Sequence, residues 1–382
     1  MSHVGAPASS RRIYLIGPAG LPNFGDELIA ATWLRYLART APDAEVWLDC
    51  HTPGTAQVML AGLHPGLRCT NTLWRLAVEA PAEEPWAVAT WVRKAVHDPG
   101  LAPWCRPGIE LLATADVIHL IGGGYVNALW PQHLGLLAGA VAAGNRSGAR
   151  LAMTGQGLVP AAPDVAELLY SLAGRFDVVD VRDRDSADLL AVAVPAEFSC
   201  DDVFLDVPGT AVSDYTRPVM VCVQSDIGEL GPPALAGRVK GILRSWEVDP
   251  ADVTFVEAIP RVDRAVHDLL ASDLPGTAFM PFSELWRDGV PAVDGQIWLS
   301  TRFHLHLTAA AAGARGVAMS VSPDYYGTKH RSLVELGSGW TMLDAAGTEV
   351  PGVPENGGYP ADTVKELGIR KARVAERIYP EF

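Results

Sequence analysis

The chain has 382 residues, 49% of them hydrophobic, and a net charge of −14 at pH 7. This length favours two domains, and the hydrophobic content excludes an intrinsically disordered protein. The acidic balance argues against a general nucleic-acid binder, which needs a basic surface. It also means that an anionic ligand would require a local basic pocket.

Several features bear on the compartment. The five cysteines are scattered, without the spacing of a metal site or a redox motif, which favours reduced core residues. Residues 1–11 are small and polar, so we expect a disordered tail and not a signal peptide. No run of 18 apolar residues predicts a transmembrane helix. We therefore expect a cytoplasmic protein with no metal.

The first half begins like a Rossmann-type unit. A buried strand over 12–17 is followed by a turn-rich loop and a helix from Asp26 to about Arg39. The loop carries Asn23-Phe-Gly-Asp26 and lacks the glycine fingerprint of dinucleotide sites, so no nicotinamide or flavin is expected. Asp26 and Glu27 are candidate acid–base groups, and helix capping is the alternative role for Asp26.

This N-terminal domain is expected to span 12–207. Residues 66–113 are less regular and predict a helical insert. Its tryptophans either stack on sugar rings or pack in the core; they are Trp74, Trp86, Trp91 and Trp104.

In the rest of this half, three turns each come directly after a buried strand. Gly122-Gly-Gly124 either lets the backbone approach a ligand closely or simply makes a tight turn. Gly155-Gln-Gly157 follows the next strand, and Arg182 follows the one after. Asp185 or Ser186 could cap the helix beyond Arg182. Ligands of open parallel sheets bind at the carboxyl ends of strands, so these turns are predicted to face a ligand.

The second half repeats the α/β pattern over 208–345, and 346–382 form an extension ending in a helix from about Ala361. Its most informative stretch is 299–313. Ser300 or Thr301 could cap a helix that ends at Gly313, a left-handed cap.

Arg302 and His304 lie at the start of this helix, where free N–H groups favour an anion. Arginine adds a permanent two-pronged charge, and histidine can move a proton near neutral pH. The alternative is that Arg302 pairs with an acidic residue on the surface and that His304 or His306 is a hydrogen-bonded core residue. Lys329 follows another strand of this half.

The ordered set of these motifs resembles the polysaccharide pyruvyl transferase family over roughly residues 13–340. The set is Asn23-Phe-Gly-Asp26, Gly122–Gly124, Gly155-Gln-Gly157, Arg182-Asp-x-x-Ser186, Thr301-Arg-Phe-His304 and Tyr326-x-x-Lys329. The resemblance implies two Rossmann-like α/β domains facing each other across a cleft, as in glycosyltransferases of the GT-B type. It implies transfer of pyruvate from phosphoenolpyruvate to two sugar hydroxyls as a ketal, with loss of phosphate.

The resemblance also implies a site. Arg302 and His304 match donor-binding positions, and Arg182 and Lys329 are expected to join them. The matching motifs add Asn23, Gly123, Gly124 and Gln156 to the expected substrate-binding residues. The expected catalytic residues are His304, Arg302 and Asp26. His304 is assigned as the acid, and the alternative is that it only binds the phosphate. Asp26, Glu27 and Asp183 are the candidate bases, and Asp183 could instead pair with an arginine.

The implied partners are phosphoenolpyruvate, as donor substrate and not as a cofactor, and a sugar or glycan acceptor, free or lipid-linked. Acceptor specificity is expected in the insert 66–113, because loops on a rigid scaffold usually carry it. One alternative is a GT-B glycosyltransferase that holds a nucleotide sugar with Arg302 and Lys329. Another is a non-catalytic glycan-binding protein, against which the charged residues argue.

Overall fold

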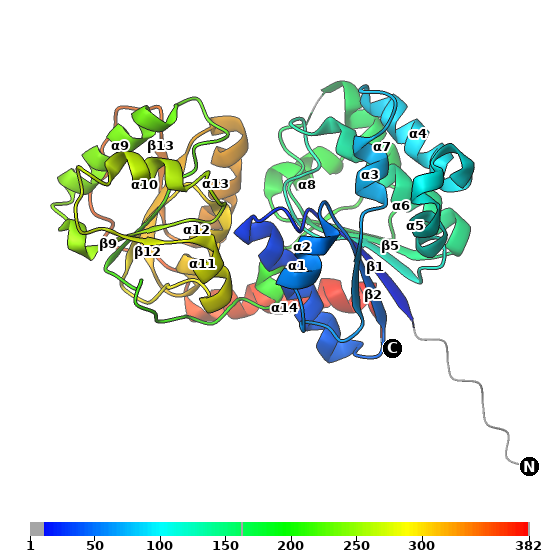
Figure 1. Ribbon diagram of the computed structural model, residues 1–382, viewed down its shortest axis with the longest axis horizontal. Helices are drawn as coiled ribbons and strands as arrows, with labels where there is room; N and C mark the ends of the chain where they lie inside the picture. The colour runs from blue at the N-terminus through cyan, green and yellow to red at the C-terminus, as the bar shows by residue number, and fades with distance from the viewer. Residues whose placement is uncertain (1–10, 162, 381–382) are drawn as a thin grey trace, which may run out of the picture.

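The computed structural model describes residues 11–161 and 163–380, which form two α/β domains (Figure 1). The predicted fold class is confirmed, because each domain is built on one parallel sheet flanked by helices. Of the expected tail, residues 1–10 lie outside the described residues.

The N-terminal domain contains a seven-stranded sheet in the order β3-β2-β1-β4-β5-β6-β7. Its central strands are buried and mostly apolar, as a parallel sheet covered on both faces requires. The strands are β1 (Arg12–Ile16), β2 (Glu45–Asp49), β3 (Leu67–Thr70), β4 (Val117–Leu120), β5 (Arg150–Gln156), β6 (Val178–Val181) and β7 (Glu197–Phe198). The α-helices are α1 (Phe24–Thr40), α2 (Pro53–Met59), α3 (Leu73–Val78), α4 (Pro85–His97), α5 (Arg106–Leu112), α6 (Leu134–Ser147), α7 (Ala166–Ala173) and α8 (Arg184–Leu190).

The segment 66–113 is not wholly the helical insert that we expected. Its first residues form β3, which pairs with β2 and is the edge strand of the sheet. Only the remainder, α3 to α5, is helical. We did not predict this strand because it has only four residues and lies at the edge of the sheet. So short a strand gives no clear pattern of apolar residues.

The C-terminal domain contains a six-stranded parallel sheet in the order β10-β9-β8-β11-β12-β13. Its strands are β8 (Val219–Cys222), β9 (Val253–Val256), β10 (Ala278–Met280), β11 (Ile297–Ser300), β12 (Arg315–Ser320) and β13 (Thr341–Asp344). Its helices are α9 (Pro232–Ser245), α10 (Arg264–Leu270), α11 (Phe282–Asp288), α12 (Phe303–Ala311) and α13 (Thr328–Glu335), and α14 (Ala361–Ile378) ends the described chain. Short 3₁₀ turns are η1 (Pro99–Leu101), η2 (Pro103–Cys105), η3 (Pro131–His133), η4 (Pro163–Val165), η5 (Asp202–Leu205) and η6 (Pro250–Asp252), and η7 (Pro323–Gly327) is a π turn.

Strand order reverses between β1 and β4 in one sheet and between β8 and β11 in the other. A crevice forms outside the carboxyl ends of the strands at such a reversal, and it is where open α/β sheets bind ligands. The domains meet near both crevices, where α1 approaches α12. There the N–H of Phe24 donates to the carbonyl of Ala258 over 2.9 Å.

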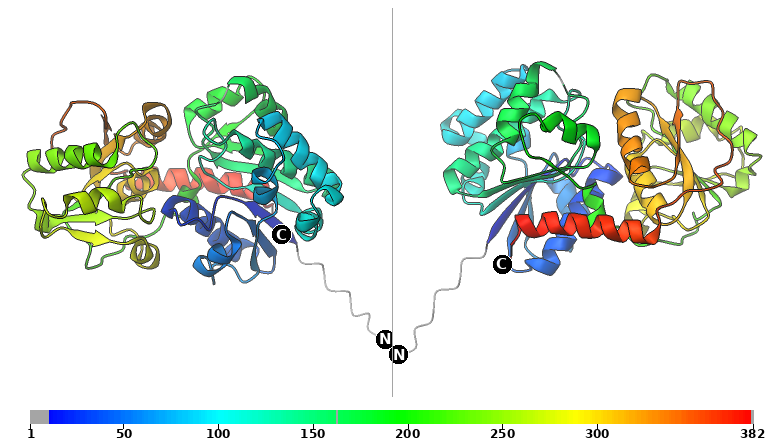
Figure 2. Two further views of the ribbon diagram at one scale, coloured as in Figure 1. Left: turned by 45° about the horizontal axis from the view of Figure 1, so that its top comes forward. Right: turned by 180° about the vertical axis from the view of Figure 1, so that it is seen from behind.

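Helix α14 returns from the C-terminal domain and packs along the N-terminal domain, as the view from behind shows (Figure 2). Lys371 on this helix is fully buried, and its Nζ donates to Asp180 over 2.5 Å and to Asp202 over 3.0 Å. Removing one partner of such a buried ion pair is strongly destabilising. The extension therefore contributes to the first domain and is anchored beneath its sheet.

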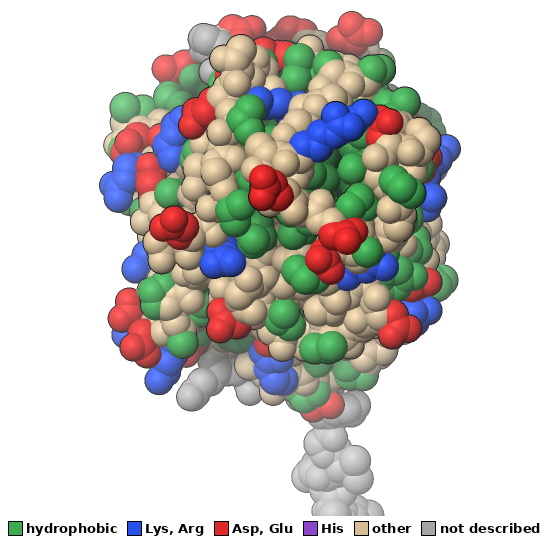
Figure 3. Space-filling model, turned by 90° about the vertical axis from the view of Figure 1, so that its left-hand side faces the viewer, with side chains coloured by type: hydrophobic (Ala, Val, Ile, Leu, Met, Phe, Trp, Pro, Cys, Tyr) green, Lys and Arg blue, Asp and Glu red, His purple; other side chains and the backbone are tan. Residues whose placement is uncertain are grey.

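The outer face of the C-terminal domain carries acidic and basic side chains interspersed, without a patch of one sign (Figure 3). No helix among the described residues is long and apolar enough to span a membrane. A basic binding site must therefore be sought elsewhere than on this face.

Candidate active site

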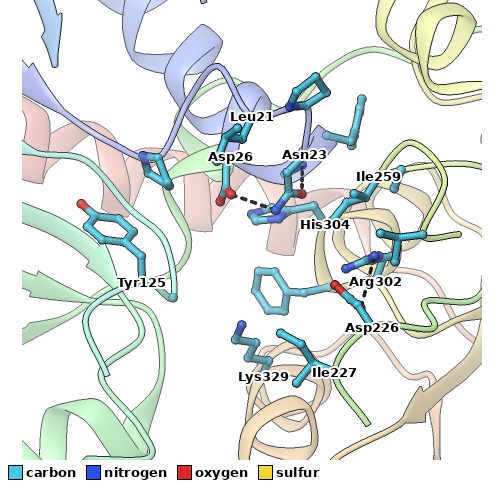
Figure 4. A pocket seen from close by; sticks show the side chains of 18 of the residues that line it. Leu21, Asn23, Asp26, Tyr125, Asp226, Ile227, Ile259, Arg302, His304 and Lys329 are labelled. Carbon is cyan, nitrogen blue, oxygen red and sulfur yellow. Dashed lines mark hydrogen bonds and ion pairs between the residues drawn. The ribbon is translucent and has the colours of Figure 1, made fainter. Parts of the chain in front are cut away.

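A cavity of about 770 Å³ lies between the two domains, at the carboxyl ends of their strands. Its walls include seven of the residues predicted from sequence, namely Asn23, Asp26, Gly124, Arg182, Arg302, His304 and Lys329. Figure 4 shows Asp26, Asn23 and His304 together on one side, and Lys329 and Arg302 on the C-terminal domain. The fold thus brings together residues more than 300 positions apart.

Gly123 and Gln156 are not among the residues that line this cavity. Gln156 is fully buried, and its Nε2 donates to the carbonyl of Ile121 over 2.8 Å. Gly123 has a φ of 149°, which favours glycine, and its carbonyl accepts from the N–H of Gly157 over 2.9 Å. Both residues connect the two glycine turns behind the cavity. They were expected to contact the substrate, but in the structure they support these turns.

The first turn of α1 supplies one wall. Asn23 is the N-cap, its Oδ1 accepting from the N–H of Gly25, while its Nδ2 donates to Asp26 Oδ2 over 2.8 Å. Asp26 therefore lies in the first turn and faces the cavity. Burial raises the pKa of Asp26, although His304 and Lys329 oppose the shift.

Glu27 points away from the cavity. It is fully buried, and its Oε1 accepts from the N–H of Gly20 over 2.7 Å. Burial raises its pKa to about 7. Glu27 thus stabilises the loop between β1 and α1. Because its carboxylate does not face the cavity, it is not a candidate base.

Two cations converge from opposite domains. A Cβ added to Gly124 would lie 2.9 Å from both Arg182 Nη2 and Lys329 Nζ, so the two charged groups share one small space. Arg182 is only 2% exposed; its Nη1 donates to Asp201 over 3.3 Å, while its buried Nε and Nη2 have no hydrogen-bond partner among the described residues. Burial, reinforced by Arg182, lowers the pKa of Lys329 well below its usual range. Unpaired buried donors of one charge create a site for an anion.

Arg302 is held differently. Its Nε and Nη2 both donate to the buried carboxylate of Asp263, at 2.6 Å for the shorter contact from Nη2, and Asp226 lies 3.8 Å away. The alternative of an arginine paired with an acid therefore applies here, although the acid is buried and not on the surface. Arg302 remains in the cavity wall, but much of its charge is already balanced.

Neither hydroxyl beside Arg302 caps α12. Arg302 itself is the N-cap, and Ser300 Oγ accepts from its N–H over 3.0 Å. Thr301 Oγ1 instead accepts from the N–H of Gln224 over 2.8 Å, beyond the end of β8. At the other end Gly313 is left-handed, with φ of 85°, as predicted.

His304 crosses the domain boundary. Its Nε2 lies 3.5 Å from Asp201 Oδ1, and its ring packs against the first turn of α1 so closely that a Cβ on Gly25 would be 1.9 Å from Nδ1. Burial alone would raise the pKa of Asp201, but His304 and Arg182 hold it below its usual value. Asp201 therefore links His304 to Arg182.

The model of the family described as polysaccharide pyruvyl transferase matches residues 23–230, just over half of the chain. This chain belongs to the polysaccharide pyruvyl transferase family. The matched region contains the Asn23 turn, Arg182 and Asp201, and ends before Arg302, His304 and Lys329.

Solved structures of other proteins share the overall architecture. One is a UDP-N-acetylglucosamine 2-epimerase, at a TM-score of 0.54 and 12% identity, with 97% of this chain and 95% of that chain covered. Another is a putative UDP-N-acetylglucosamine 2-epimerase from Listeria monocytogenes, at 0.53 and 11%, with 98% and 92% covered. Anabaena HepE in complex with UDP-glucose gives 0.52 and 14%, with 96% and 95% covered. At such identities these likenesses show the fold alone, and no curated protein matches the chain.

In this pyruvyl transferase family member, Asp183 is not a base facing the cavity. It is the N-cap of α8, its Oδ1 accepting from the N–H of Ser186 over 2.7 Å. The capping role that we expected of Asp185 or Ser186 falls to it. The Nε of Arg182 lies 4.0 Å from the Asp183 carboxylate. Of the two roles expected for Asp183, pairing with an arginine therefore agrees better with the structure than acting as a base.

Of the two histidines on α12, His304 and His306, it is His306 that lies in the core. It is fully buried, with Nδ1 3.0 Å from His330 Nδ1 and Nε2 2.9 Å from Ser338 Oγ. Burial lowers its pKa well below the usual range. Its partners are internal and it does not line the cavity, so it supports α12 from within the core.

The tryptophans of 66–113 do not reach the cavity. Val78 is the residue of this segment that lines it, and Trp74 is buried in the core. Trp130, which the sequence analysis did not single out, lines the cavity instead. The sequence analysis also assigned no role to Asp201 and Asp263. The aspartate pair Asp201-Asp202, three residues beyond the end of β7, is the signal that could have drawn attention to the first.

The described residues contain no cluster of three or more histidine, cysteine or acidic side chains arranged to hold a metal ion. The charged part of the cavity is lined by the cations Arg182, Arg302 and Lys329, by His304, and by the carboxylates of Asp26 and Asp226. This set suits binding of a small anion and movement of protons beside it.

Proposed function

We propose that the protein transfers pyruvate from phosphoenolpyruvate to hydroxyls of a sugar, forming a ketal and releasing phosphate. The observation that carries the proposal is the convergence of Arg182 and Lys329 over Gly124, with buried guanidinium N–H groups left unpaired. A phosphate would satisfy those donors and offset two like charges. Membership of the family supports the same reaction.

Phosphoenolpyruvate carries a second anion, its carboxylate. Arg302 lies at the start of α12, where the helix dipole also favours negative charge. We place the carboxylate there and the phosphate between Arg182 and Lys329. The methylene carbon then lies near His304, between the two domains.

His304 is proposed to protonate the methylene carbon, which leaves an oxocarbenium-like centre at the carbon bearing the phosphate. One sugar hydroxyl attacks that carbon while Asp26 accepts its proton; burial raises the pKa of Asp26, which makes its carboxylate a stronger base. The bond from carbon to phosphate oxygen then breaks, and a second hydroxyl closes the ketal. One hydroxyl proton replaces the proton lost from His304, and the other leaves on the phosphate, so the enzyme is regenerated.

Asp201 is proposed to hold His304 in place, because its carboxylate faces Nε2 from the opposite domain. We also propose that the reaction takes place in the cytoplasm. All five cysteines are free, as a reducing compartment would keep them. The acceptor is a sugar or glycan, free or lipid-linked.

Thermal unfolding with millimolar phosphoenolpyruvate, beside UDP-glucose and GDP-mannose, tests the donor. A ligand at about a hundred times its dissociation constant stabilises the fold by about 2.7 kcal/mol. We expect that shift with phosphoenolpyruvate in the wild type and in Lys365→Met, an exposed lysine on α14, and its loss in Lys329→Met. Stabilisation by a nucleotide sugar alone would instead support a glycosyltransferase and overturn the proposal.

A further inference from the structure

The cavity has two chemically different ends. Arg182, Arg302, Lys329, His304 and Asp26 surround one of them. The other end is a wall of the N-terminal domain, formed by His51, Val78, Tyr125, Trp130, Gln132 and His133, and none of these six is a lysine, arginine, aspartate or glutamate. Tyr125 lies across the cavity from Arg302 and Asp226 (Figure 4).

The two histidines of this wall are uncharged at neutral pH. His133 is buried, and its Nδ1 donates to the carbonyl of Tyr125 over 2.7 Å. Burial lowers the pKa of His133 to about 4 and also lowers that of His51. Their rings lie 6.3 Å apart, so protonating either would disfavour protonation of the other. The wall therefore offers aromatic faces and neutral polar groups only.

Trp130 is the half-buried member of an aromatic stack. Its ring is nearly parallel to that of His133, with centroids 6.3 Å apart and an angle of 11°. It also meets Tyr325 of the C-terminal domain edge-on at 6.1 Å. The indole is held from two sides, so its orientation is fixed before a ligand arrives, which lowers the entropic cost of binding.

The stack also joins the two ends of the cavity. Lys329 Nζ lies 3.4 Å over the ring of Tyr325, whose hydroxyl donates to the carbonyl of Gly124 over 2.9 Å. Trp130 and the proposed phosphate site are therefore separated by a single aromatic ring. A molecule lying against Trp130 would present its polar groups to the reacting end.

We infer that the wall formed by Trp130, Gln132 and His51 is the acceptor subsite, and that it takes an uncharged sugar residue stacked on the Trp130 indole. This inference rests on the proposed function. Pyranose rings combine an apolar C–H face with hydroxyls at the edge, which suits an aromatic platform beside neutral hydrogen-bonding groups. A hexuronic acid would bring a carboxylate to a wall without a cation to pair with it, and desolvating an unpaired charge is costly.

Saturation-transfer NMR with methyl β-glucoside, methyl β-galactoside and methyl β-glucuronide, each with phosphoenolpyruvate present, tests the inference. The glucoside and the glucuronide form a matched pair that differs only at C6. We expect transfer to the C–H protons of at least one uncharged glycoside, and binding at least about tenfold weaker for the glucuronide. Trp130→Ala should weaken the uncharged glycoside at least about tenfold, whereas Trp130→Phe should retain part of the affinity.

Trp104→Ala is the matched control, since Trp104 is 51% exposed and lies outside the cavity. Stabilisation of Trp130→Ala by phosphoenolpyruvate would show that the variant is folded and its donor site intact. The subsite is overturned if the glucuronide binds as well as the glucoside, if Trp130→Ala binds like the wild type, or if no uncharged glycoside binds the wild type. Glycoside binding without any response to phosphoenolpyruvate would instead refute the proposed donor and leave the subsite standing.

Discussion

Gly25 lies where the first turn of α1 meets the ring of His304, and the space between them excludes even a methyl group. A Cβ at this position would be 1.9 Å from Nδ1 and 2.7 Å from Cε1. An ordinary contact requires about 3.4 Å, so in Gly25→Ala the rigid imidazole or α12 must move by roughly 1.5 Å. The displacement acts on the proposed proton donor itself.

Misplacing a catalytic group by about 1 Å can cost about 100-fold in rate. We therefore expect Gly25→Ala to slow phosphate release from phosphoenolpyruvate about 100-fold, measured with an acceptor glycoside that supports turnover. Overpacking of this kind costs about 1–3 kcal/mol of stability, which leaves the protein folded. Stabilisation by phosphoenolpyruvate should persist, because Arg182 and Lys329 are not displaced by the methyl group.

Gly237→Ala is the matched control, because Gly237 also lies in a helix, α9, and a Cβ there would meet nothing within 4 Å. It should leave turnover unchanged and raise the free energy of unfolding by about 0.5–1 kcal/mol. A Gly25→Ala enzyme that turns over at the wild-type rate would refute the assignment of His304 to the chemical step.

Three further outcomes are expected. Asp201→Asn should lower kcat at least about tenfold with little change in KM for phosphoenolpyruvate, because it removes the charge that faces the proposed acid; an equal loss in KM would assign Asp201 to donor binding instead. Lys371→Met should reduce the free energy of unfolding in urea by about 3–5 kcal/mol, whereas Lys365→Met on the same helix should change it little. His119 is fully buried, and burial lowers its pKa to about 3. Between that pH and about 6, His119 is therefore protonated in the unfolded chain but neutral in the folded chain. Stability should therefore fall by about 2 kcal/mol from this group as the pH is lowered from 7 to 5, and the fall should be smaller by that amount in His119→Gln.

Much of the architecture could be predicted from local sequence. Buried apolar runs that alternate with helical segments specify parallel sheets covered by helices, because both faces of each strand must be apolar. Placing Arg182 and Lys329 after such strands also put them at the carboxyl edge of a sheet, where both are found. These inferences needed only residues within a few positions of each other.

Caps and bracing contacts were harder to assign. The hydroxyl of Ser300 or of Thr301 was expected to cap α12, but that of Thr301 accepts from the backbone N–H of Gln224, 77 residues away. Gln156 belongs to a motif that predicted a ligand contact, but its side chain is buried and donates to the carbonyl of Ile121. In each case the side chain had an equally good partner that is distant in sequence, and local propensity cannot rank the two.

The sequence by itself determined that an arginine and two histidines stand at the start of one helix, beyond the end of a buried strand. Only the tertiary structure decided which histidine faces the cavity. Residues two apart on an α-helix point about 200° away from each other, so His304 and His306 cannot share an environment. The packing of α12 against α1 turned His304 towards Asp201 of the other domain and His306 towards His330 in the core. That choice depends on contacts between domains, which no local pattern encodes.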